Sequence, residues 1–161
     1  MKITFAPKGI VQIDDAKLIF RNFSGAPSKF NRDGDRNFAI IIPTQEQAEA
    51  LMNEGWNVRI KPPRDMGEEP FRYLPIKLSF DGNGRGPAIY LKSGRNVQKL
   101  DADTIGILDD IDIMSADLDI RPYHWEMGGN TGITAWLQGM DVTQNATRFD
   151  LRYAEEEFPQ E

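Results

Sequence analysis

Cysteine is absent from this chain of 161 residues, and histidine occurs only once, at His124. Without thiols the protein can form no disulfide, no thiolate metal site and no cysteine nucleophile. The single imidazole excludes a cluster of several histidines around a metal, and it allows a Ser/His/Asp triad only if His124 is the base. No cofactor or metal is indicated by the remaining residues. We therefore expect a protein that is not an enzyme.

Long hydrophobic runs are missing as well. The first residues lack the apolar stretch of a signal peptide, and no segment approaches the roughly 18 apolar residues of a membrane helix. These two absences predict a soluble protein that does not enter a membrane, and by default a cytoplasmic one.

Positive charge is scarce, but its distribution matters more than its sum. The formal net charge is −6, and residues 154–161 carry four acids and no base. Without those four acids the preceding 153 residues stand at only about −2. We expect one folded domain over residues 1–153, long enough for a sizeable core, followed by a disordered acidic tail over residues 154–161.

Two segments of alternating character meet at Gly128, Gly129 and Asn130 within residues 118–142. These residue types take positive φ at little cost, so the stretch predicts a β-hairpin with a short loop. Its strands carry large rings next to cations, namely Arg121, Tyr123, Trp125 and Trp136. A sheet needs this mixture if unpaired bases are to stack on it while cations hold the phosphates. The alternative is that the rings simply pack in a core.

A loop rich in Gly, Pro, Ser, Asn and Asp is predicted over residues 24–35. Cations and aromatic rings alternate in and around it, at Arg21, Phe23, Lys29, Phe30, Arg32 and Arg36. A loop that exposes rings among cations can fold over a strand of nucleic acid. The alternative is a solvated loop with one phenylalanine beneath it.

Residues 56–61 and 71–80 read as two strands with a cationic or aromatic outer face. Alternation puts Arg59 and Lys61 on one face of the first strand, and Tyr73 and Lys77 on one face of the second. If the two strands pair, these four side chains form one surface that could stack bases and bind phosphates.

One helix is predicted, with Thr44 as its N-cap, Gln47 completing a capping box and Gly55 ending it. Around it we count roughly seven short strands separated by turn signals, without an alternation of strands and helices. This pattern predicts a mainly β fold, a small barrel like the oligonucleotide-binding barrels, with one helix inserted between strands.

Three weaker motifs are set aside. The glycine-rich residues 81–87 lack the Gly-Lys-Ser/Thr ending of a phosphate loop, and residues 33–35 lack the other ligands of a calcium loop. Aspartates between residues 101 and 119 could hold magnesium for a nuclease, but they alternate with apolar residues like an ordinary solvated strand face.

Several stretches, taken together, resemble the compact single-stranded-DNA-binding proteins of tailed bacteriophages. They are residues 20–25 (FRNFSG), 34–38 (GDRNF), 119–125 (DIRPYHW), 132–137 (GITAWL) and the acidic tail with its phenylalanine. The resemblance implies a cationic and aromatic groove for single strands. It also implies a tail that recruits replication or recombination proteins, here through Glu155, Glu156, Glu157 and Phe158. The chain departs from that pattern by continuing to Glu161 instead of ending in phenylalanine.

Our leading hypothesis is a protein that binds and protects single-stranded DNA during phage replication or recombination, with little sequence preference, in the host cytoplasm if a phage encodes it. The residues expected to stack bases are Phe23, Phe30, Tyr73, Tyr123, Trp125 and Trp136, and those expected to hold phosphates are Arg21, Lys29, Arg32, Arg36, Arg59, Lys61, Lys77 and Arg121. Two alternatives stay open: an acidic module that inhibits a host nucleic-acid enzyme or mimics DNA, and a β-barrel whose tryptophans stack on sugars. An oligomer is compatible with all three.

Overall fold

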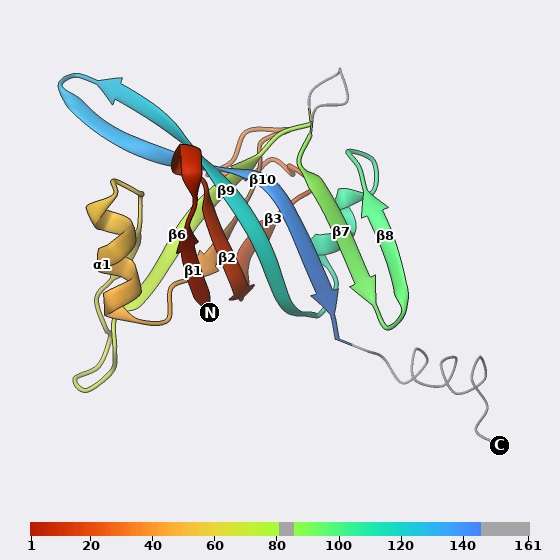
Figure 1. The fold of residues 1–161 in the computed structure, drawn as a ribbon, viewed down its shortest axis with the longest axis horizontal. Coiled ribbons are helices and arrows are strands. Elements are labelled where there is room, and N and C mark those ends of the chain that lie inside the picture. Colours follow the sequence, from red (N-terminus) through yellow and green to blue (C-terminus); the bar gives the residue numbers. More distant parts are fainter. Residues whose placement is uncertain (81–85, 146–161) are drawn as a thin grey trace.

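The fold is seen in a computed structural model that describes residues 1–80 and 86–145. Ten strands are present: β1 (Lys2–Phe5), β2 (Val11–Ala16), β3 (Leu18–Asn22), β4 (Arg36–Ile41), β5 (Arg59–Lys61), β6 (Phe71–Leu78), β7 (Ala88–Ser93), β8 (Asn96–Leu100), β9 (Ile113–Met127) and β10 (Asn130–Gln144). One α-helix, α1 (Gln45–Asn53), and two short 3-10 helices, η1 (Pro7–Gly9) and η2 (Ile105–Asp109), complete the described elements (Figure 1). None of these helices is long and apolar enough to cross a membrane.

All ten strands belong to one hydrogen-bonded sheet, whose main path runs β1-β2-β9-β10-β6-β4-β3. Among the described residues no ladder joins β1 to β3, so the sheet is open. The predicted closure into a barrel is therefore wrong. Strand β10 pairs with β6 at residues 135–136 and with β7 at residues 139–143. The sheet therefore forks at β10, and β7 with β8 forms a separate branch (Figure 1).

The predicted hairpin is confirmed in strands β9 and β10. Met127 pairs with Asn130, and the two residues between them, Gly128 and Gly129, have φ values of 58° and 85°. Positive φ at both central positions matches the right-handed twist of the flanking strands, which explains why two glycines stand there. The end of the hairpin projects from the body as a two-stranded arm (Figure 1).

The predicted helix is confirmed, but the capping box is not: the Gln47 side chain donates to the Met1 carbonyl at 2.9 Å, and its Oε1 atom has no hydrogen-bond partner among the described residues. The Thr44 side chain accepts a hydrogen bond from the backbone N–H of Gln47 at 3.1 Å, which satisfies one free donor of the first turn. After Asn53 the chain leaves the helix through Gly55, whose φ is 97°. Ala48 and Leu51 are the buried residues of α1, so the helix covers one part of the core.

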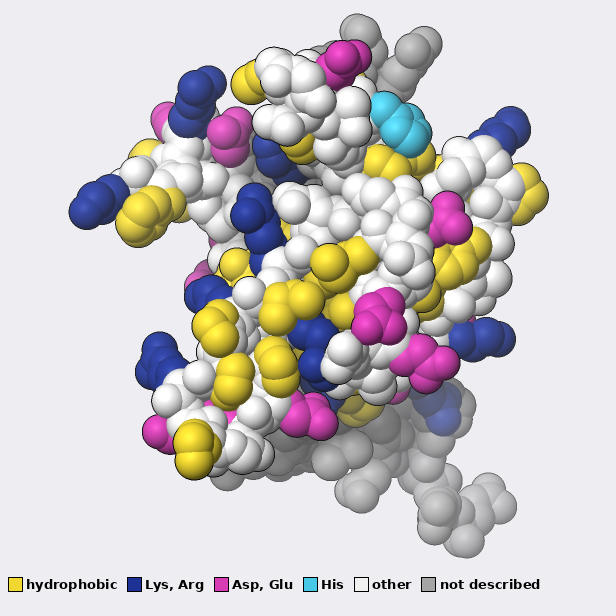
Figure 2. All heavy atoms as spheres, turned by 90° about the vertical axis from the view of Figure 1, so that its left-hand side faces the viewer, with side chains coloured by type: hydrophobic (Ala, Val, Ile, Leu, Met, Phe, Trp, Pro, Cys, Tyr) yellow, Lys and Arg dark blue, Asp and Glu magenta, His cyan; other side chains and the backbone are white. Residues whose placement is uncertain are grey.

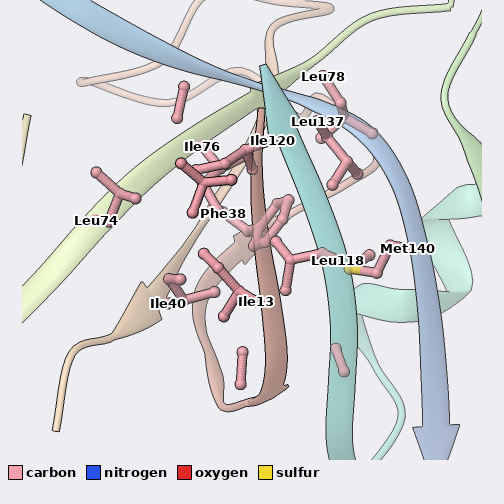
Figure 3. Close-up of a cluster of buried hydrophobic side chains, with 14 of the residues drawn as sticks. Ile13, Phe38, Ile40, Leu74, Ile76, Leu78, Leu118, Ile120, Leu137 and Met140 are labelled. Carbon is pink, nitrogen blue, oxygen red and sulfur yellow. The ribbon is translucent and has the colours of Figure 1, made fainter. Parts of the chain in front are cut away.

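The core lies on the inner face of the curved sheet. Figure 3 shows side chains from β2, β4, β6, β9 and β10 converging there, among them Ile13, Phe38, Ile76 and Ile120. Because side chains alternate along a strand, the residues between these positions on β4, β6 and β10 face outward. The outer face of these three strands is where the predicted cations and rings must be sought.

Candidate nucleic-acid interface

A row of four residues crosses the outer face of β9, β10, β6 and β4. Trp136 pairs with Arg121 on one side and with Lys77 on the other, and Lys77 pairs with Asn37. Directly opposite residues point to the same face of a sheet, so these four side chains form one line, which we call the central row. The guanidinium carbon of Arg121 lies 5.8 Å from the centre of the Trp136 ring. Three of the predicted binding residues are thus brought together.

A groove of about 450 Å³ opens over three residues of the central row, Trp136, Lys77 and Asn37. Its lining residues come from the loop and start of β4, from β6 with Ser79, and from Trp136: Phe30, Asn31, residues 34–38, residues 75–79 and Trp136. Phe30 stands at this groove with 92% of its surface exposed, and the Lys29 ammonium lies 5.7 Å from its ring centre. An exposed ring and a cation thus stand beside the groove, as binding of a single strand requires.

The loop that carries Phe30 is held in place by its own hydrogen bonds. The amide nitrogen of Asn31 donates to the backbone carbonyls of Ala26, Arg32 and Asp35, each at 3.0 Å. Gly25 accepts from the backbone N–H of Gly34 at 2.8 Å, and a Cβ on Gly25 would lie 2.9 Å from the Gly34 backbone. Only glycine fits that approach. Phe30 is therefore presented by a preformed loop.

A second cluster of rings lies farther along the outer face of β6. The Phe20 ring centre is 6.3 Å from that of Phe71 and 5.3 Å from that of Tyr73, and both pairs meet edge to face. The Lys61 ammonium lies 5.6 Å from the Phe20 ring centre and 5.8 Å from that of Tyr73. We call Phe20, Phe71 and Tyr73 the three-ring cluster. Arg59, opposite Tyr73 on β5, is exposed beside it.

Phe20 and Phe71 were missed by sequence reasoning. Phe71 alternates in step with Tyr73 and Lys77, so the same period of two could have found it. Phe20 had no such signal. An extra residue in β3 shifts its register between Ile19 and Asn22, and Phe20 takes a φ of 51° within this irregularity. Its ring is 57% exposed as a result.

The same irregularity removes Phe23 from the predicted interface. Phe23 is completely buried and stacks on Phe38 with ring centres 4.8 Å apart, so it offers no face to a base. The expectation that it is exposed is corrected. Fixed alternation failed here because the extra residue changes which side chains of this segment point inward.

Arg21 and Arg36 also have structural partners instead of open surroundings. Arg21 Nη1 donates to the backbone carbonyls of Leu108 and Ile111 at 2.8 and 2.6 Å. Arg36 Nη1 donates to the carbonyl of Phe23 at 2.7 Å. Both guanidiniums satisfy carbonyls that the 3-10 segment and the loop leave without strand partners, which argues against the predicted contacts of Arg21 and Arg36 with phosphates.

The remaining predicted residues are more dispersed. Tyr123, 57% exposed, lies two residues beyond Arg121 on the hairpin arm and on the same face. Trp125 covers Gly132 and lines a different cavity, of about 480 Å³, next to the end of α1. Arg32 is exposed in the loop. The acidic tail residues, Glu155–Phe158, lie outside the described residues.

Negative charge gathers next to the Arg121 end of the central row, because Asp119 lies two residues before Arg121 on the same face of β9. Asp14, Asp117, Asp119 and Asp141 line a cavity of about 260 Å³ on β2, β9 and β10. Partial burial, together with the charges of Asp14 and Asp141, raises the pKa of Asp119 above its usual value. Phosphates would be repelled from this cavity. The side of the molecule beside α1 instead shows hydrophobic side chains gathered with Lys and Arg among them (Figure 2).

The chain also matches a known sequence family. A family model described as "Putative phage ssDNA-binding domain" matches residues 2–161, nearly the whole chain. The chain therefore belongs to the family of phage single-stranded-DNA-binding domains.

Solved structures with a similar fold include two of one bacteriophage protein. The chain is similar to the single-stranded DNA-binding protein from bacteriophage Enc34 in complex with ssDNA, with a TM-score of 0.53 and 10% identity, covering 91% of this chain and 93% of that one. A C-terminally truncated form of the Enc34 protein gives a TM-score of 0.51 and 12% identity over 89% of this chain and 90% of that one. At these identities the likeness concerns the fold, and it confirms the predicted mainly β class. No curated protein sequence matches the chain.

Proposed function

We propose that the protein binds single-stranded DNA on the outer face of β4, β6 and β10, with the groove over the central row as the core of the interface. The observation that carries this proposal is the row itself. A flat ring, Trp136, stands between the cations Arg121 and Lys77 on an open surface, and Phe30 stands at the same groove. Family membership favours this function over the acidic inhibitor and the sugar-binding barrel.

Binding would combine two physical terms. Stacking of an unpaired base on an aromatic ring contributes about 1 to 3 kcal/mol per base, and it depends little on sequence because every base has a π face. Lys77, Arg121 and the loop cations Lys29 and Arg32 would neutralise phosphates and release counterions, which makes affinity fall with salt. No chemical step is involved. Such binding protects exposed strands during phage replication or recombination.

The placement of charge reconciles this function with an acidic protein. The aspartates around Asp119 line a cavity on β2, β9 and β10 that borders Arg121, whereas Lys77 lies at the groove on β6, two strands away from β9. A strand in the groove would therefore meet Lys77 and the loop cations, while Asp119 offsets part of the charge of Arg121.

Titration of oligo-dT at low and high salt, followed by fluorescence anisotropy, tests the proposal. The change to examine is Lys77→Ala, and the matched control is Lys99→Ala, which removes an exposed lysine from β8, on the other branch of the sheet. Lys77→Ala should weaken binding at low salt, while Lys99→Ala should not. Failure of the wild-type protein to bind, or equal losses in both variants, would contradict the proposed interface.

We further propose that the acidic tail recruits replication or recombination proteins through Glu155–Phe158. The composition of residues 154–161 and the resemblance to phage proteins with such tails support this role. Removing residues 154–161 should leave oligo-dT binding intact or stronger and abolish co-purification with the phage replication proteins. Unchanged co-purification would contradict recruitment by the tail.

A further inference from the structure

We infer that the groove and the three-ring cluster are two base-stacking sites on one continuous surface, and that a single strand lies lengthwise along β6 to reach both. We call each site a station and the surface that joins them the track. This inference rests on the proposed function and adds to it the path of the strand and the minimum length that occupies the whole interface.

Both stations lie on the same face of one strand. Phe71, Tyr73 and Lys77 point outward from β6, while Arg72, Leu74 and Ile76 between them are buried. The partner strands extend this face at both ends. Lys61 pairs with Phe71 at one end, and Trp136 pairs with Lys77 at the other. Each end of the track therefore has rings and a cation.

The spacing of the stations sets the length of strand required. At about 3.3 Å per residue, Tyr73 and Lys77 are about 13 Å apart along β6, and Phe71 and Lys77 about 20 Å. A strand that keeps a stacked spacing of about 3.4 Å per nucleotide crosses this distance with about four to six nucleotides. A trinucleotide would then occupy one station at a time, whereas a decanucleotide would reach both.

The backbone at Phe20 points to a role for the three-ring cluster beyond packing. Phe20 is a bulky residue in the left-handed region, at φ 51°, where glycine is normally preferred. Such strain persists where the surrounding structure imposes it, and it concentrates at binding sites. Here the strained residue ends with its ring largely exposed, against Tyr73 and below the Lys61 ammonium. A phenylalanine that served only to pack in the core would not have its ring exposed in this way.

The positive φ of Phe20 allows the ring to be removed by a substitution that the backbone tolerates. Phe20→Gly removes the ring and relieves the backbone, so the fold should be retained, with an unchanged or higher melting temperature. Phe30→Ala removes the ring at the groove. The control is Phe5→Ala, because Phe5 is a ring of similar exposure, 49%, on β1 and away from β6.

The measurement is the ratio of the affinities for dT10 and dT3, by anisotropy for the longer strand and by NMR titration for the shorter. In the wild-type protein the ratio should be large, because the second station is engaged intramolecularly. Phe20→Gly and Phe30→Ala should each weaken dT10 binding by about 10-fold or more and reduce the ratio, since each removes one stacking platform. Phe5→Ala should leave both affinities unchanged.

Two results would overturn the track. If Phe30→Ala weakens dT10 binding and Phe20→Gly leaves the ratio at its wild-type value, only the groove binds DNA, and the proposed function stands without the track. If dT10 does not bind the wild-type protein at all, the proposed function fails together with the track.

Discussion

Replacing Arg21 with alanine should damage the fold and not the DNA interface. Its guanidinium donates two hydrogen bonds to part-buried backbone carbonyls, those of Leu108 and Ile111. Hydrogen bonds from a charged donor contribute about 1.5 to 3 kcal/mol each, and water can reach the freed carbonyls in part. We therefore expect Arg21→Ala to lower the free energy of unfolding by about 2 to 4 kcal/mol, a large share of the roughly 5 to 15 kcal/mol typical of a domain.

Two measurements on the same variants separate stability from binding. Urea unfolding should show a midpoint lower by about 1 to 2 M for Arg21→Ala, taking a slope of about 2 kcal/mol/M. The dependence of oligo-dT affinity on salt should be unchanged. Lys77→Ala should give the reverse pattern: an unchanged urea midpoint, and a slope of log affinity against log salt that is smaller by about 0.7, the loss of one phosphate contact on a single strand.

The refuting result follows from that contrast. If Arg21→Ala reduces the salt slope by the amount expected for one phosphate while its urea midpoint stays at the wild-type value, Arg21 contacts DNA. The carbonyl contacts of Arg21 would then be dispensable, and our division between structural and binding cations would be wrong.

Three further changes have defined outcomes. Phe23→Ala should lower the free energy of unfolding by about 3 to 5 kcal/mol in urea titrations, because it empties a fully buried site, and a loss under 1 kcal/mol would contradict that burial. Folding raises the pKa of the Asp119 carboxyl above its usual value of 3.8, so the stability that this group contributes is fully present below pH 3.8 and is lost as pH rises through the folded pKa. Asp119→Asn should therefore raise the free energy of unfolding at pH 7. A lower urea midpoint at that pH would refute this sign. Gly132→Ala places a Cβ 2.5 Å from the Trp125 ring, so it should displace that ring and cost about 1 to 3 kcal/mol, and an unchanged near-ultraviolet circular dichroism spectrum would count against the contact.

Local signals were sufficient for the hairpin and the helix. Gly128 and Gly129 prescribe a two-residue turn whatever surrounds them, and Thr44 caps a helix through its own third neighbour. Alternation also correctly placed Arg59 and Tyr73 on one surface, because β5 and β6 pair in regular register. For such elements the information lies within a few residues of the chain.

Features that depend on distant strands could not be predicted. The extra residue in β3 is defined only against its partner β4, and it decides that Phe20 points outward while Phe23 is buried. The structural role of Arg21 depends on carbonyls more than 80 residues away in the sequence. The fork of the sheet likewise results from how β10 divides its edge between β6 and β7. A period of two contains none of this information.

The shared edge of β10 has a consequence for how the protein opens. Its first half holds β6, and through it β4 and β3, while its second half holds β7 and β8. Either branch can separate from β10 only by breaking its ladder of hydrogen bonds with that strand. Both branches depend on the same strand, so they are not independent units of unfolding. Backbone amides of β10 are therefore expected to show the slowest hydrogen exchange, and the proposed DNA-binding surface draws its rigidity from the same strand that supports the opposite branch.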